Sequence, residues 1–295
     1  MRVRLLATDG QGSFHETEWI KPDITQDEIE VQAVITGVCR SDIDMMLGKF
    51  SLLPQQMMGH EGIGQVTKVG DNIKDVKAGD YVATRGEPAY ADYYNVRVNE
   101  YVKIATAEPK YILEPVACGI NMVEQNRQLL RAKRGRLAIL GTGFLAWTAF
   151  QTLAINNYEF EIDVVGGSNA GRWGQLLKRE LQGKYDVVID LSSRTDYLDG
   201  EHLNNNALIV IGTDKVINQQ LGNLIWKSIM ISFASPRTKE FIRCMRQAEE
   251  WIRLDMLTVD GFWTQCYSRQ DWPQAFKDSL IRHPGYNRGY IDWRL

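Results

Sequence analysis

The sequence has little of what marks a secreted, membrane-spanning or nucleic-acid-binding protein. Its 295 residues contain four cysteines without close pairs, which argues against a disulfide framework and favours the reducing cytoplasm. Lysine and arginine number 34 against 37 aspartate and glutamate residues, so the net charge of −3 provides no basic face for nucleic acid or an anionic membrane. No apolar run reaches the ~18 residues of a membrane-spanning helix. We therefore expect a cytoplasmic protein that binds neither nucleic acid nor membrane.

The chain does contain two kinds of secondary-structure pattern, which alternate along the sequence. Residues 1–113 are rich in strands and punctuated by glycine, as in the polar–apolar alternation over 29–38. Residues 114–259 alternate helical segments with compact apolar strands, which predicts a doubly wound parallel sheet with helices on both faces, an α/β fold. Residues 260–295 return to the strand texture. The expected strands of the middle region are 137–140, 162–165, 187–190 and 207–212.

A glycine-rich turn opens the middle region. The stretch Gly141-Thr142-Gly143-Phe144-Leu145-Ala146 follows an expected strand and begins a helical run. The first glycine permits a tight turn, the second lets backbone approach a pyrophosphate, and the small Ala146 lets helix pack on strand. The helix N-terminus supplies N–H groups for the phosphates. This context predicts a dinucleotide-binding site formed by Gly141, Gly143, Phe144 and Leu145.

The residues after the second expected strand bear on which nucleotide binds. NAD sites place a carboxylate at this strand end to hold the ribose hydroxyls. This chain instead has glycines followed by Ser168 and Asn169, which can donate hydrogen bonds, and Arg172, which can pair with a 2′-phosphate. The pattern favours NADP(H) over NAD(H). Two alternatives stay open: Arg172 is a solvated helix residue, or a shifted strand register makes Asp163 the ribose acid and favours NAD.

A second motif joins a thiol to an imidazole. Cys39 begins the run Cys39-Arg40-Ser41-Asp42, and His60 stands in Gly59-His60-Glu61-Gly62. Donors this far apart in sequence cannot share one short loop, but the fold can bring them together. A thiolate and an imidazole are ligands of tetrahedral zinc, and a site with few protein ligands keeps a position open for substrate.

The spacing continues with Gly64, Gly70 and Ile73, and the whole pattern resembles the signature of the zinc-dependent alcohol dehydrogenases. The chain is thereby identified as a member of the medium-chain dehydrogenase/reductase family. The resemblance implies a barrel-like GroES-like catalytic domain over 1–113 and 260–295, with a Rossmann domain over 114–259. It also implies hydride transfer between NADP(H) and a small alcohol, ketone or aldehyde.

The resemblance implies roles for further residues near the metal. Cys39 and His60 match two zinc ligands, and Glu61 matches an acid that completes or exchanges at the coordination sphere. Glu114, in a Glu-Pro pair like that of the sorbitol dehydrogenase branch, matches the third protein ligand, directly or through water; Cys118 is the rival for that position. Asp42 matches the carboxylate that accepts the other ring N–H of the zinc-bound histidine.

Three neighbours match groups that handle cofactor and proton. Arg40 matches a residue that reaches the cofactor pyrophosphate, and Ser41 matches the hydroxyl that bonds the substrate oxygen and passes on its proton. Asp44 stands where many relatives carry a relay histidine. It relays protons itself, or protons leave by another route, or alcohol oxidation is lost, or Asp44 caps the following helix.

An absence completes the expectations. Relatives usually insert a lobe with four closely spaced cysteines for a structural zinc, whereas residues 80–93 contain none. The sequence therefore predicts one Zn²⁺ per chain. A homodimer is one open alternative for the oligomeric state. Two rival functions also stay open: a zinc-free quinone or enone reductase of the same superfamily, and a non-catalytic nucleotide-binding protein with the inherited fold.

Overall fold

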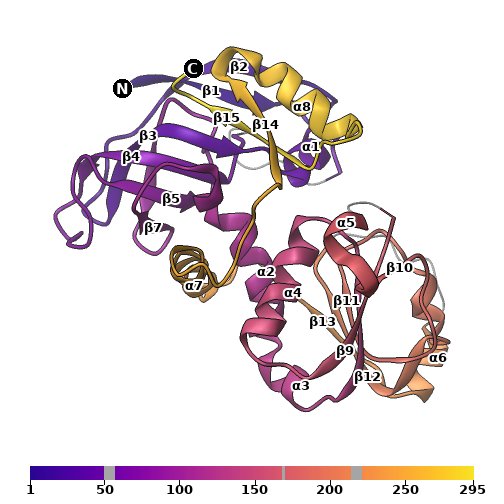
Figure 1. Ribbon diagram of the computed structural model, residues 1–295. Coiled ribbons are helices and arrows are strands. Elements are labelled where there is room, and N and C mark those ends of the chain that lie inside the picture. The colour runs from indigo at the N-terminus through magenta and orange to yellow at the C-terminus, as the bar shows by residue number, and fades with distance from the viewer. Residues whose placement is uncertain (50–56, 168–169, 214–220) are drawn as a thin grey trace. The chain divides into compact units, whose positions relative to one another are not determined.

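The computed structural model describes residues 1–49, 57–167, 170–213 and 221–295 (Figure 1). The chain divides into two compact units, Met1–Pro115 with Met245–Leu295, and Val116–Cys244. The chain returns to the first unit earlier than the expected residue 260, because the greater part of the helix Phe241–Arg253 belongs to that unit. No helix among the described residues is long and apolar enough to cross a membrane.

The first unit is built on a mainly antiparallel sheet, ordered β14-β15-β3-β4-β5-β7, with β6 also paired to β3. Only β14 and β15 run parallel to each other. The C-terminal strand β15 pairs with β3, so the last strand of the chain joins the sheet of the N-terminal region (Figure 1). The strands are β3 (Glu28–Gly37), β4 (Glu61–Val69), β5 (Tyr81–Arg85), β6 (Tyr93–Arg97), β7 (Tyr101–Ile104), β14 (Trp263–Ser268) and β15 (Arg288–Asp292).

A hairpin and three helices complete this unit. Strands β1 (Arg2–Thr8) and β2 (Phe14–Ile20) pair antiparallel in a separate two-stranded sheet. Helix α1 (Arg40–Met46) packs against α8 (Trp272–Ile281). Helix α7 (Phe241–Arg253) is amphipathic, as its sequence predicts, with apolar side chains buried along one face.

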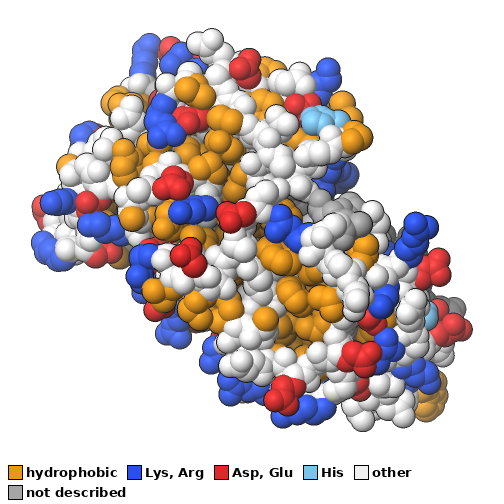
Figure 2. Space-filling model, in the orientation of Figure 1, with side chains coloured by type: hydrophobic (Ala, Val, Ile, Leu, Met, Phe, Trp, Pro, Cys, Tyr) orange, Lys and Arg blue, Asp and Glu red, His pale blue; other side chains and the backbone are white. Residues whose placement is uncertain are grey.

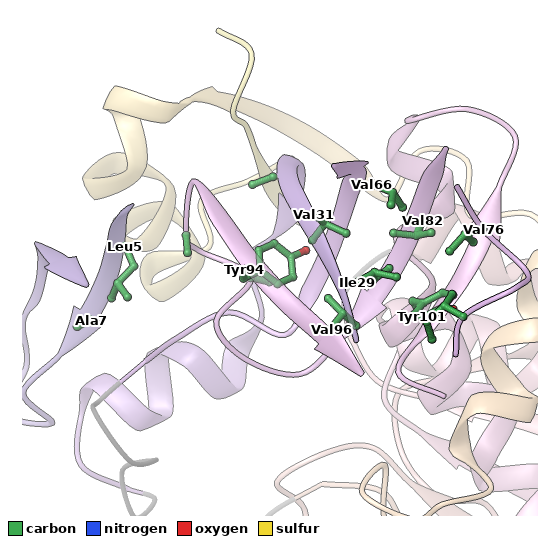
Figure 3. Close-up of a cluster of buried hydrophobic side chains, with 14 residues drawn as sticks. Leu5, Ala7, Ile29, Val31, Val66, Val76, Val82, Tyr94, Val96 and Tyr101 are labelled. Atoms are coloured by element: carbon green, nitrogen blue, oxygen red, sulfur yellow. The ribbon is translucent and has the colours of Figure 1, made fainter. Parts of the chain in front are cut away.

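The core of the first unit follows from strand alternation. Ile29 and Val31 of β3 point to the same face and pack with Val66, Val82 and Tyr94 from neighbouring strands (Figure 3). Burying such side chains stabilises the fold by roughly 1.5–3 kcal/mol each before entropy is counted. This rigid sheet carries the ends of β3 and β4, where the candidate metal ligands lie.

The second unit is a six-stranded sheet, wholly parallel, in the order β10-β9-β8-β11-β12-β13. The chain moves outward from β8 in one direction and then from β11 in the other, so the order reverses between them. Ligands of such sheets bind at this switch point, beyond the carboxyl ends of the strands. The strands are β8 (Gly135–Leu140), β9 (Phe160–Val165), β10 (Leu177–Lys178), β11 (Tyr185–Asp190), β12 (Leu203–Ile211) and β13 (Met230–Phe233).

Helices cover both faces of this sheet, as the sequence predicts. In β8, Leu137 and Ile139 join a core with helices α2 and α4, whereas Ala138 and Leu140 join a core on the opposite face with α6. The central strands are therefore apolar on both sides, which explains their continuous hydrophobic runs. The helices are α2 (Leu113–Gln125), α3 (Arg127–Arg131), α4 (Phe144–Ile155), α5 (Ala170–Trp173) and α6 (Gly222–Trp226).

Charged side chains of both signs are interspersed over the surface in view (Figure 2). This distribution agrees with the small net charge of −3. The visible face shows no extended region of positive charge.

Candidate functional site

The sheet of the first unit brings the two halves of the candidate metal centre together. Cys39 is the N-cap of α1, directly after β3, and His60 directly precedes β4. Because β3 and β4 are antiparallel neighbours, with Thr36 opposite Gly62, the end of one strand lies beside the start of the other. The donor atoms of Cys39, His60 and Glu61 all lie within 4.8 Å of one another.

A charge contact and a hydrogen bond orient the imidazole in this cluster. His60 Nδ1 lies 3.4 Å from Asp42 Oδ1, and His60 Nε2 lies 3.3 Å from the Ser41 hydroxyl. The same hydroxyl donates to Cys39 Sγ at 3.1 Å. The Asp42 contact turns Nε2 toward the thiol, so the ring presents this nitrogen to the centre of the cluster.

The electrostatics of the cluster favour a cation. Burial alone would lower the pKa of His60, but the charges of Asp42 and Cys39 outweigh it and raise the pKa well above its usual value. Surroundings that favour a proton on the ring also favour a dipositive ion among these donors. A thiolate, an imidazole and a carboxylate with an outer carboxylate on the imidazole form a donor set typical of zinc, so the residues fit the metal that the sequence predicts.

Glu61 has a second partner that sequence reasoning missed. Both carboxylate oxygens of the fully buried Glu61 accept from Arg288 Nη2 of β15. Burial alone would lower the pKa of Arg288, but the charges of Glu61 and Cys39 raise it, so the guanidinium stays charged. A Cβ at Gly37 would overlap the Glu61 carboxylate, which explains the glycine at the end of β3. No local spacing connects Arg288 to the motif, and only strand pairing brings it here.

The remaining predicted residues of this region lie in two other places. Glu114, in the first turn of α2, is buried but is not a member of the three-residue donor group; it lies within electrostatic range of Arg288. Its rival Cys118 is half-buried in the same helix. Asp44 lies within α1, where its Oδ1 accepts from Lys49 Nζ at 2.8 Å and Arg40 Nε at 3.3 Å. The alternative that Asp44 caps a following helix is therefore wrong.

The glycine-rich turn of the second unit has the expected geometry. Gly141 follows β8 with a φ of +118°, and a Cβ there would lie 3.0 Å from the Leu191 carbonyl oxygen. Gly143 is the N-cap of α4, and Phe144 and Leu145 begin its first turn. The turn lies at the carboxyl end of β8, beside the point where the strand order reverses. The turn and the start of α4 therefore stand where a pyrophosphate binds in folds of this kind.

The end of the second strand carries no carboxylate. Strand β9 ends at Val165 and continues into Gly166 and Gly167, while Ser168 and Asn169 lie outside the described residues. The guanidinium of Arg172 lies 4.9 Å from the centre of the Trp147 ring, a cation–π arrangement that holds its direction.

The Asp163 carboxylate binds other side chains of the second unit. It lies inside β9, opposite Ala138, and its Oδ2 accepts from Arg136 Nη2 at 2.6 Å and from the Tyr185 hydroxyl at 2.9 Å. The shifted register that would have placed Asp163 at the ribose does not occur.

Comparisons with known proteins agree with this fold. Residues 25–106 match the family model described as the alcohol dehydrogenase GroES-like domain. The chain is 22% identical over 331 residues to D-arabinitol dehydrogenase 1 of Uromyces fabae, covering 88% of this chain and 89% of the relative. It is 31% identical over 94 residues to the sorbitol dehydrogenase of Mus musculus, covering 30% of this chain and 26% of the relative.

Among solved structures, 2R,3R-butanediol dehydrogenase of Bacillus subtilis superposes with a TM-score of 0.78 at 15% identity, over 98% of this chain and 99% of that one. In sequence and fold the chain is thus similar to oxidoreductases of the alcohol dehydrogenase type in the medium-chain dehydrogenase/reductase family, with a GroES-like unit and a Rossmann-like unit.

Proposed function

We propose that the chain is a zinc-dependent oxidoreductase that transfers a hydride between NADP(H) and a small alcohol, ketone or aldehyde. The observation that carries the proposal is the convergence of the Cys39, His60 and Glu61 donors within 4.8 Å. The arabinitol and sorbitol dehydrogenases among the relatives support a polyol as the substrate. One zinc per chain is proposed, since residues 80–93 contain no cysteine for a structural site.

Cys39 and His60 would hold the metal, and Glu61 would complete the sphere or exchange with it. When bound, zinc supplies Lewis-acid stabilisation to the substrate oxygen. Asp42 keeps the imidazole turned so that Nε2 serves as the ligand atom. Glu114, which lies outside the group of three donors, is proposed as the third protein ligand of the zinc, either directly or through a bound water.

Proton transfer is assigned to Ser41. Its hydroxyl lies between Cys39 Sγ and His60 Nε2, at 3.1 and 3.3 Å, so it borders the position where a substrate oxygen would bind. We propose that Ser41 relays the substrate proton: during oxidation its hydroxyl accepts that proton as its own proton passes on, and during reduction the transfer runs in reverse. Asp44 is proposed as the next member of the relay and the acceptor of that proton; Arg40 and Lys49 contact its carboxylate.

The nucleotide is assigned to the second unit. The turn formed by Gly141, Gly143, Phe144 and Leu145 would bind the pyrophosphate at the N-terminus of α4, and Arg40 is proposed as a further cofactor-binding residue. Arg172, stacked on Trp147, would pair with the 2′-phosphate of NADP(H), with Ser168 and Asn169 as further donors. The lack of a carboxylate directly after β9, at Gly166 and Gly167, supports NADP(H) over NAD(H).

Elemental analysis of the chelator-washed full chain, beside Cys39→Ser, tests the metal. We expect one zinc per chain in the wild type and its loss in the variant, because the thiolate is a direct ligand. Carbonyl reduction with NADPH should disappear with the metal. Folded wild-type protein without zinc would contradict the proposal and favour the zinc-free quinone or enone reductase.

A further inference from the structure

A buried phenol stands behind the candidate metal ligands. Tyr90 belongs to the segment between β5 and β6, far from Cys39 and His60 in sequence, and is 0% exposed. Its backbone N–H donates to the Met58 carbonyl at 3.2 Å, and the Ala89 N–H donates to the Gly59 carbonyl at 2.9 Å. These two backbone hydrogen bonds hold Tyr90 beside residues 58 and 59, which directly precede His60.

The Tyr90 hydroxyl reaches the carboxylate that orients the imidazole. It lies 2.8 Å from Asp42 Oδ2 and 2.9 Å from the Gly37 carbonyl oxygen. The same Oδ2 accepts the Cys39 backbone N–H at 3.1 Å, while Oδ1 faces His60 Nδ1 at 3.4 Å. A buried carboxylate needs such donors because it has lost its water, so Tyr90 supplies a large part of what holds Asp42 in place.

Packing prevents the ring from moving away. Gly59, with a φ of +87°, lies so close to the Tyr90 ring that a Cβ would meet ring carbons at 2.7 Å. Phe276 of α8 contacts the ring edge-on, with centroids 5.4 Å apart. Burial, followed by the charge of Asp42, raises the pKa of Tyr90 well above its ordinary value, so the hydroxyl remains a proton donor.

We propose that Tyr90 is a positioning residue for the metal centre: its hydroxyl holds the Asp42 carboxylate, which in turn orients His60 Nε2 toward the metal. This inference rests on the proposed function, since it assigns Tyr90 to the zinc that Cys39 and His60 would bind. Without the hydroxyl, Asp42 keeps the Cys39 N–H but loses the donor that sets the rotation of its carboxyl group. Outer-sphere partners of zinc histidines typically change metal affinity 10–100-fold, and Tyr90 acts one bond further out. We therefore expect an effect of about tenfold.

The test compares Tyr90→Phe with Tyr94→Phe. Tyr94 is a matched control, because it is equally buried in the same unit and its hydroxyl bonds to Thr84 at 2.8 Å instead of to Asp42. Zinc affinity of the full chain is measured by competition with a chromophoric chelator, and the ligand field by the visible spectrum of the Co²⁺-substituted protein. We expect Tyr90→Phe to weaken zinc binding about tenfold and to shift the Co²⁺ bands. Tyr94→Phe should leave both unchanged.

A double-mutant cycle shows whether Tyr90 acts through Asp42. In an Asp42→Ala background, which removes the acceptor of the Tyr90 hydroxyl, Tyr90→Phe should have no further effect on zinc affinity. Equal zinc affinity and equal Co²⁺ spectra in wild type and Tyr90→Phe would overturn the inference alone. Wild-type protein that binds no zinc would instead overturn the proposed function on which it rests.

Discussion

Arg288 and Glu61 form a buried ion pair in which each charge depends on the other. The Glu61 carboxylate is wholly removed from solvent, and Arg288 Nη2 contacts both of its oxygens. Burying a single charge destabilises the folded state, whereas the attraction of an oppositely charged partner offsets this cost. Arg288 therefore neutralises the Glu61 carboxylate of the candidate metal centre when no cation is bound there.

Arg288→Gln should lower the free energy of unfolding in chelator by about 3 kcal/mol, because the Glu61 charge loses its partner. Added zinc should stabilise this variant more than the wild type, since the cation takes over the neutralisation. Urea unfolding with and without zinc measures both effects. If zinc stabilised the variant and the wild type equally, the Glu61 carboxylate would not interact with the bound metal.

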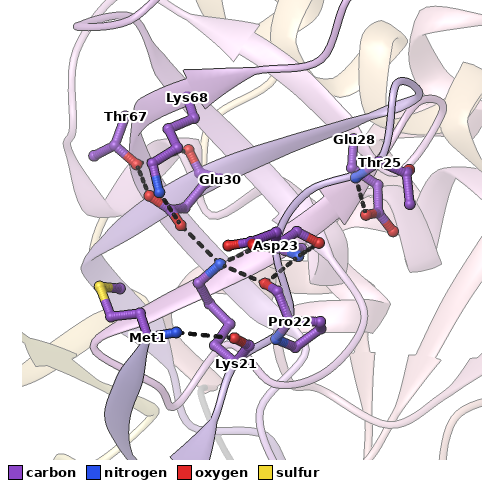
Figure 4. Close-up of polar contacts among 10 residues, drawn as sticks. Met1, Lys21, Pro22, Asp23, Thr25, Glu28, Glu30, Thr67 and Lys68 are labelled. Atoms are coloured by element: carbon purple, nitrogen blue, oxygen red, sulfur yellow. Dashed lines mark hydrogen bonds and ion pairs between the residues drawn. The ribbon is translucent and has the colours of Figure 1, made fainter.

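A second buried pair lies far from the site. Lys21 Nζ lies 2.7 Å from Glu30 Oε2, with both side chains almost fully buried, and Thr67 and Lys68 also bind this carboxylate (Figure 4). Burial by itself would raise the pKa of Glu30, but the hydrogen bonds from Lys21, Thr67 and Lys68 outweigh it and lower the pKa below 4.5. The pair therefore stabilises the unit at neutral pH.

Lys21→Met should lower the free energy of unfolding at pH 7 by about 3 kcal/mol, whereas Lys110→Met, in an exposed pair with Glu108, should cost less than about 1 kcal/mol. Because the folded-state pKa of Glu30 is depressed, its contribution is present above about pH 4.5 and lost as pH falls through the folded-state pKa. Unfolding followed from pH 7 to pH 3 should show the difference between wild type and Lys21→Met shrinking. A constant difference would refute this origin of the stability.

At the scale of elements, the proposed preference for NADP(H) depends on the residues that follow β9. Its glycines leave room beside the strand end, and α5 directs Arg172 over the Trp147 ring. The direction of this guanidinium is thus set by a contact between α5 and α4. A stacked arginine loses little further freedom when it pairs with a phosphate.

Arg172→Ala should raise the KM for NADPH about tenfold or more and leave the KM for NADH nearly unchanged, because only NADPH carries the 2′-phosphate. Arg179→Ala, an exposed arginine of the same unit, is the control. Steady-state kinetics with both cofactors measure the ratio. A parallel rise in both KM values would indicate a structural role for Arg172 and leave cofactor preference unexplained.

At the scale of the whole molecule, each of the two units has its own core and its own proposed ligand. The clusters around Val31 and around Ile139 belong to different units. A ligand stabilises the unit that binds it by mass action. Zinc and NADPH should therefore each raise the unfolding temperature of a different unit.

Calorimetry of the full chain should resolve two transitions, with zinc raising the Tm of one and NADPH raising the Tm of the other. Cys39→Ser should abolish the zinc shift and preserve the NADPH shift. A single transition raised by either ligand would mean that the units unfold together.

Local patterns in the sequence determined most of the elements and both binding motifs. Strand alternation predicted β3, and the apolar runs predicted β8, β9, β11 and β12, because side-chain periodicity follows directly from backbone geometry. Cys39 and His60 could be predicted as neighbours because their spacing matches a known signature. Gly141 could be predicted because its positive φ favours glycine, and Gly143 because the motif places it at the start of α4.

Tertiary structure alone decided which distant groups complete the site. Arg288 meets Glu61 only because β15 pairs with β3, and Tyr90 meets Asp42 only because its segment bonds to residues 58 and 59. The pairing of β8 with β9 likewise placed Asp163 beside Arg136. Periodicity and spacing describe neighbours along the chain, whereas these contacts depend on strand pairing between residues far apart in sequence.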